Sequence, residues 1–112
     1  MAEKIKLVQG DTYPQVKVTL TEENSGQPID LTGATVTLHF RAVGGTTALF
    51  SRNGFVNPQT ATNGEAIFQW QAGDLNVPAG DYEGEIEAVW SSTGARQTAY
   101  ELLKFKVRED IA

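Results

Sequence analysis

The sequence contains no cysteine and a single histidine among its 112 residues. Without cysteine it has neither disulfides nor thiolate ligands for zinc, and one histidine alone makes other zinc sites rare. Secreted domains of this size often carry a disulfide, so the absence of cysteine favours assembly in a reducing cytoplasm. The loop aspartates also lack the close spacing of a calcium-binding loop. We therefore expect no metal and no cofactor.

Long apolar runs and large basic clusters are missing as well. No run approaches the length of a membrane span, and the N-terminal residues contain no apolar stretch typical of a signal peptide. The formal net charge is −5, which argues against a nucleic-acid partner because phosphate binding requires clustered cations. The one basic cluster, Lys104, Lys106 and Arg108, alternates along a predicted solvated strand face.

Residues that could perform chemistry are scattered. His39 is predicted to face outward from a strand, and the serines lie beside turns without the pattern of a nucleophile elbow. A row of three glutamates, Glu83, Glu85 and Glu87, alternates with an apolar face, which predicts a hydrated surface. The functional alternative for this row is an acidic docking strip for a basic partner. We expect that the protein is not an enzyme.

Alternation of apolar and polar residues with a period of two dominates the chain, and a helical period is nowhere sustained. Turn residues separate about seven short strands, the pattern of an immunoglobulin-like antiparallel β-sandwich. We expect one such domain over residues 1–112. The expected strands cover residues 4–8, 15–21, 34–42, 47–51, 65–71, 82–90 and 97–107, with a short 3₁₀ connector at 71–76.

The stretch around Gly80 and Tyr82 is the strongest indication of the fold. A tyrosine that begins a strand just after a glycine-containing corner is typical of immunoglobulin-like sandwiches, where its hydroxyl bonds to the backbone of the corner. We therefore predict that Gly80 and Tyr82 form a structural corner, with Tyr82 buried and bonded within residues 74–79.

Aromatic side chains beside a polar loop are the best candidates for partner binding. Phe50 and Phe55 flank residues 51–54, and Arg52 lies between them. Because loops carry binding sites more often than strands, Phe50, Arg52 and Phe55 are predicted to face a partner. Trp70 and Trp90 continue inward-facing rows and are expected in the core or at its rim.

Five segments in order resemble the N-terminal domain family of phage baseplate upper proteins and related small tail-associated domains. The segments begin at residues 9, 28, 63, 78 and 102, and read QGDTYPQVKVTL, PIDLTGATVTLHFR, NGEAIFQW, PAGDYEGEIEAVW and LLKFKV. The segment at 28–36 carries the most specific part of the resemblance.

The resemblance implies an immunoglobulin-like sandwich without enzymatic activity, placed in the virion after assembly in the host cytoplasm. Its partners would be other virion proteins of the tail or baseplate, including copies of the same chain in a symmetric ring. Two alternatives remain open: a capsid decoration protein of the same fold, and a carbohydrate-binding β-sandwich module that stacks sugars on Phe50, Phe55 or Trp90. A membrane partner and a nucleic-acid partner are not expected.

Overall fold

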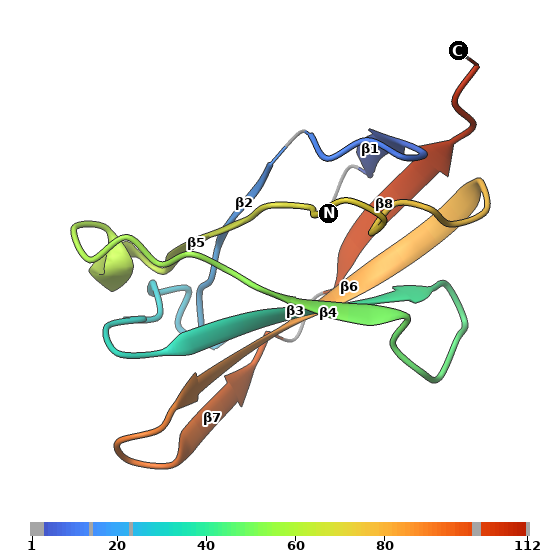
Figure 1. The fold of residues 1–112 in the computed structure, drawn as a ribbon. Helices are drawn as coiled ribbons and strands as arrows, with labels where there is room; N and C mark the ends of the chain where they lie inside the picture. Colours follow the sequence, from blue (N-terminus) through green and yellow to red (C-terminus); the bar gives the residue numbers. More distant parts are fainter. Residues whose placement is uncertain (1–3, 14, 23, 100–101, 112) are drawn as a thin grey trace.

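The computed structural model describes residues 4–13, 15–22, 24–99 and 102–111. Within these ranges the chain forms eight strands and one 3₁₀ helix, η1 (Figure 1). The elements are β1 (Ile5–Val8), β2 (Val16–Thr19), β3 (Thr35–Ala42), β4 (Phe50–Asn53), η1 (Ala61–Asn63), β5 (Glu65–Phe68), β6 (Gly80–Trp90), β7 (Ala95–Thr98) and β8 (Leu103–Arg108). The all-β prediction is confirmed. No helix in the described ranges is long and apolar enough to cross a membrane.

The strands form a β-sandwich of two sheets. The larger sheet has the order β1-β8-β6-β3-β4, with β7 also paired to β6, and β2 and β5 form the smaller sheet. All pairings are antiparallel except that of β1 with β8, so the expectation of a purely antiparallel sandwich is wrong at this edge. The single last strand predicted over 97–107 is divided, because the 11-residue β6 accommodates both β7 and β8 along one side.

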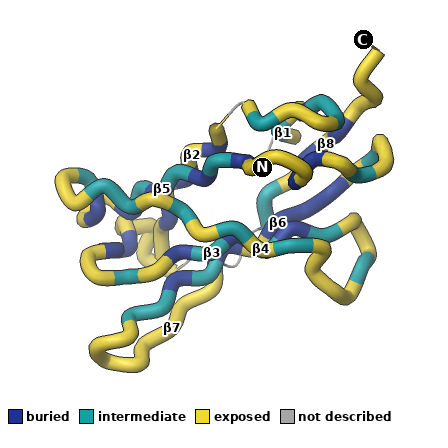
Figure 2. Tube along the Cα trace, in the orientation of Figure 1, coloured by how far each residue is buried: buried dark blue, intermediate teal, exposed yellow. Residues whose placement is uncertain are grey.

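The core lies between the two sheets. Alternate residues of the long strands point inward, and Figure 2 shows the resulting buried positions on β3 and β6. Trp70 lies among aromatic rings, with edge-to-face contacts to Phe40 at 5.6 Å and to Phe105 at 5.7 Å between ring centroids. The largest fully buried side chains are Trp70, Phe40, Phe68, Phe105, Leu31, Leu38, Leu75, Ile86, Val36 and Val107. The predicted core position of Trp70 is confirmed.

Two local predictions differ from the structure. The strand expected at 47–51 begins at Phe50, since residues 43–49 form turns and bends that delay its pairing with β3. The 3₁₀ helix is η1, Ala61–Asn63, whereas residues 71–76 contain turns. The pairing of β4 with β3, which puts Phe50 opposite Phe40 and Arg52 opposite Leu38, decides which side chains of β4 face the core.

Candidate interaction surfaces

Phe50 belongs to the core rather than to an exposed loop. It pairs with Phe40 across β4 and β3 and stacks on its ring, with centroids 4.8 Å apart. A second contact joins Phe50 edge-to-face to Trp70 at 6.2 Å. The side chain is therefore half-buried and packed against the core. Contrary to the prediction, Phe50 does not form an exposed aromatic pair with Phe55.

Arg52 is engaged inside its own chain. Its Nε donates to Oδ2 of Asp74 at 2.9 Å, and a second guanidinium nitrogen donates to Oδ1, so the pair is bidentate. Asp74 is only 8% exposed, and it also accepts the backbone N–H of Gln71 at 2.8 Å. The guanidinium carbon lies 5.7 Å from the ring centroid of Phe50. Arg52 thus ties β4 to the turn that follows β5 and completes the hydrogen bonding of a buried carboxylate.

Phe55 is the one predicted partner-binding residue that the structure presents to solvent. Its side chain is 60% exposed, whereas its backbone exchanges two hydrogen bonds with Ile67 of β5, at 2.7 and 2.9 Å. The preceding Gly54 donates to Val36 of β3 at 2.8 Å. The chain therefore leaves the larger sheet at Gly54 and joins the smaller one at Phe55, which holds an exposed aromatic ring on a fixed backbone.

Close packing explains why glycine stands at this crossing point. A Cβ atom on Gly54 would lie 2.7 Å from the ring of Phe68, which is fully buried. Any side chain would force the segment away from β5. Glycine thus lets the chain pass over the Phe68 ring and reach the smaller sheet.

The glutamate row on β6 is less hydrated than its alternation predicts. Glu83 is only 6% exposed, because Arg41 of β3 donates to it from Nε at 2.7 Å and Lys104 of β8 lies 3.7 Å away on its other side. Glu85 alone of the three is exposed. With cations from both neighbouring strands beside Glu83, the row does not form an uncompensated acidic strip for a basic partner.

A second row of polar side chains crosses the outer face of the same sheet. The Nδ1 atom of His39 lies 2.7 Å from the hydroxyl of Ser51, and Nε2 lies 3.2 Å from Glu87. Arg96 of β7 pairs with the other oxygen of Glu87. No local pattern in the sequence indicates this grouping, since its members come from four strands.

Three of these four residues, His39, Glu87 and Arg96, line an open hollow of about 320 Å³. The order serine, histidine, carboxylate is the order used in nucleophilic catalysis. Here Arg96 shares the carboxylate with His39, and Ser51 lies on an edge strand of a twisted open sheet rather than on a strained turn. We interpret the group as a cross-strand polar ladder that links β4, β3, β6 and β7.

The predicted corner at Gly80 and Tyr82 is confirmed. Tyr82 is 5% exposed, and its hydroxyl donates to the carbonyl of Pro78 at 2.6 Å. Gly80 has a φ of 153°, a conformation that glycine adopts readily. Burial raises the pKa of the Tyr82 phenol still further above neutral pH, where the hydroxyl is protonated and can donate.

Replacing Tyr82 with phenylalanine is expected to lower the free energy of unfolding by about 1 kcal/mol, because the hydrogen bond from this buried residue to the carbonyl of Pro78 is lost. Denaturant titration measures this change. Tyr13→Phe is the matched control, since Tyr13 is 65% exposed, and its midpoint should stay where it is. An unchanged midpoint in Tyr82→Phe would mean that the corner bond contributes nothing.

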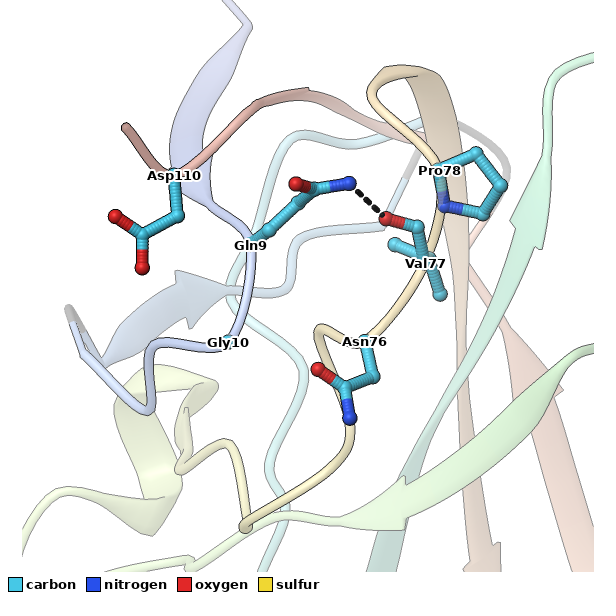
Figure 3. A pocket seen from close by; sticks show the side chains of 6 residues that line it. All are labelled: Gln9, Gly10, Asn76, Val77, Pro78 and Asp110. Atoms are coloured by element: carbon cyan, nitrogen blue, oxygen red, sulfur yellow. Dashed lines mark hydrogen bonds between the residues drawn. The ribbon is translucent and has the colours of Figure 1, made fainter. Parts of the chain in front are cut away.

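A hollow with a volume of about 580 Å³ lies beside this corner (Figure 3). One side of it is held by Gln9, whose side-chain amide donates to the carbonyl of Val77 at 2.8 Å. Asn76 and Asp110 supply the remaining polar side chains of its lining. The lining residues include no serine, threonine, lysine or histidine, and the described residues contain no group of three potential metal ligands.

Comparison with known proteins adds no family to this description: no protein-family model matches the sequence, and no curated protein matches it.

Proposed function

We propose that this chain is a non-enzymatic structural protein of a bacteriophage tail or baseplate that docks other virion proteins. The order of sequence motifs, from the segment at residue 9 to the segment at residue 102, supports this proposal through its resemblance to baseplate-associated domains. The β-sandwich with open sheet edges is compatible with repeated contacts to copies of the same chain or to a neighbouring ring protein.

Phe55 is the observation that carries the docking proposal. An aromatic side chain that is 60% exposed loses contact with water when a partner covers it, and its backbone is already fixed by two hydrogen bonds to Ile67. Little conformational entropy is therefore lost on binding. Ile67 lies on the same outward face of the smaller sheet, since its neighbours Ala66 and Phe68 are buried, and it extends the apolar surface.

Replacing Phe55 with aspartate tests the proposal. We expect the variant to fold with an unchanged denaturation midpoint, because the ring contributes little to the core, and to be lost from assembled particles by tenfold or more. Val43→Asp is the matched control, since Val43 is also exposed, at 53%, but lies in the turn after β3. Quantifying both variants in purified particles separates the outcomes. Normal incorporation of folded Phe55→Asp would exclude this surface as the interface.

The two alternatives differ in what the structure offers them. A capsid decoration protein of the same fold would use the same surfaces, and only its position in the particle separates it from a tail protein. A sugar-binding platform needs several exposed, coplanar aromatic rings, yet Phe50 and Trp90 are both half-buried against the core. Of the three rings proposed for stacking, Phe55 alone is exposed, and a glycan array with wild type and Phe55→Asp tests that alternative.

A further inference from the structure

The edge formed by β1 and β8 carries positive charge on an otherwise acidic protein. The two strands run parallel, which brings Lys6 directly beside Lys106 and Val8 beside Arg108. All three cationic side chains are exposed. Like charges that face each other across neighbouring strands are destabilising. The sequence alone indicated only the row on β8, and the parallel pairing adds Lys6 to it.

Much of this positive charge has no anionic partner in the described residues. Lys4 pairs with Asp81 at 3.0 Å and Lys104 approaches Glu83 at 3.7 Å, whereas the ion pairs of the described chain do not include Lys6 or Lys106. Lys106 helps Lys4 to lower the pKa of Asp81, but only from a longer distance. The cationic edge therefore complements an acidic partner.

Backbone groups at the same edge are available for pairing. The amide of Gln9 donates to the carbonyl of Arg108 at 3.0 Å, which fixes the alternation along β1: Leu7 and Gln9 turn their backbone groups toward β8, and Lys6 and Val8 turn theirs away. The carbonyl of Val8 accepts the amide of Asp11 at 3.2 Å. No described strand pairs with this side of β1.

The shape and polarity of the edge formed by β1 and β8 also fit an acidic partner. A hollow of about 280 Å³ lies between Lys6, Leu7, Val8, Lys106 and Arg108. The aliphatic stems of the lysines and the side chain of Val8 can contact the methylene groups of acidic side chains on this outer face while the charged ends remain at the surface. Cations, an aliphatic hollow and a free strand edge thus occur together in one place.

We propose that the free edge of β1 receives an extended acidic segment of a partner protein, added as a further strand with its carboxylates beside Lys6, Lys106 and Arg108. Such a segment alternates acidic residues on the outer face with apolar residues on the inner face. This inference deepens the proposed docking function and rests on it only for the identity of the partner as a virion protein. A peptide strand uses the backbone groups of β1, which a nucleic acid does not, and the net charge of −5 also disfavours a nucleic acid.

The test titrates the full chain with a capped eight-residue peptide of alternating glutamate and valine. Binding is monitored by NMR as changes in the chemical shifts of the protein's backbone amides. We expect the largest shifts at the amides of Lys6 and Val8, and binding about tenfold weaker in the double variant Lys6→Gln, Lys106→Gln. Ser92→Asp with Gln97→Glu changes the net charge equally at two exposed sites of the β6–β7 hairpin, and it should bind as the wild type does.

Two further probes distinguish the addition of a strand to β1 from non-specific electrostatic attraction. A peptide N-methylated on the residues that face β1 should lose binding, because it cannot donate to the carbonyl of Lys6. The inference would be overturned if the methylated peptide bound as tightly as the unmethylated one, or if the hairpin control lost as much binding as the lysine double variant. It would also be overturned if an eight-nucleotide single-stranded DNA bound at these residues more tightly than the peptide. Those results would leave the Phe55 incorporation test unaffected, so the two proposals fail separately.

Discussion

Replacing Gly64 with alanine is expected to lower the free energy of unfolding by about 3 kcal/mol or more. Gly64 has a φ of 76°, and a Cβ atom there would lie 2.4 Å from the carbonyl oxygen of Leu20 and 3.1 Å from that of Ile29. Both neighbours are backbone atoms, so no side-chain rotation relieves the clash. The carbonyl of Gly64 also accepts the amide of Leu20 at 2.8 Å, a bond that the displacement would lengthen.

Gly94→Ala isolates the conformational part of this effect. Gly94 has nearly the same φ, 75°, in the turn between β6 and β7, and a Cβ atom there has no atom within 4 Å. The free energy of unfolding of Gly94→Ala should therefore fall only by the cost of placing alanine in the left-handed conformation, about 1 kcal/mol. Thermal or denaturant unfolding of both variants measures the difference. Equal losses would show that the approach of Gly64 to Leu20 and Ile29 is looser than the structure indicates.

Replacing Asp74 with alanine is expected to lower the free energy of unfolding by about 2–3 kcal/mol. The substitution leaves the guanidinium of Arg52 and the amide of Gln71 without their acceptor. The Arg52 side chain is 22% exposed, so water can reach part of the freed charge, and the loss stays at the low end for a buried pair.

Asp74→Asn and Asp81→Ala distinguish the contributions at this position. Asparagine keeps an acceptor for Gln71 but removes the charge, so its midpoint should fall between those of wild type and Asp74→Ala. Asp81 is an exposed partner of Lys4, and its removal should leave the midpoint almost unchanged. Denaturation midpoints at neutral pH measure all three variants. If Asp74→Ala unfolds like Asp81→Ala, the contact with Arg52 is not structural.

The role of Arg52 also affects how docking is tested. A charge reversal at this position would place a carboxylate next to Asp74 and destabilise the domain, so its absence from particles would not identify an interface. Phe55 avoids this difficulty, because its side chain extends into solvent while its backbone holds the pairing with Ile67.

Local sequence predicted the features that depend on neighbouring residues. The corner at Gly80 and Tyr82 was predictable because its hydrogen bond joins residues four apart, Tyr82 and Pro78. The alternation of β3 likewise predicted its buried and half-exposed faces. In both cases the residues that determine the structure lie within one turn or one strand.

Contacts between distant segments explain the predictions that failed. Phe50 and Arg52 face inward because β4 pairs with β3 so that they lie opposite the buried Phe40 and Leu38. The acceptor of Arg52 lies 22 residues away along the chain. Glu83 is buried by cations from β3 and β8, which alternation within β6 cannot show. The parallel pairing of β1 with β8 joins the two ends of the described chain, and no local pattern specifies it.

The most direct test of the proposed function is quantitative mass spectrometry of particles purified from a phage whose genome carries the gene for this chain. Under the proposal we expect the protein at several copies per particle, at a fixed ratio to the other tail or baseplate proteins, because the proposed docking repeats by symmetry in a ring. Its absence from purified particles, while it accumulates in the infected host, would contradict the assignment as a virion structural protein.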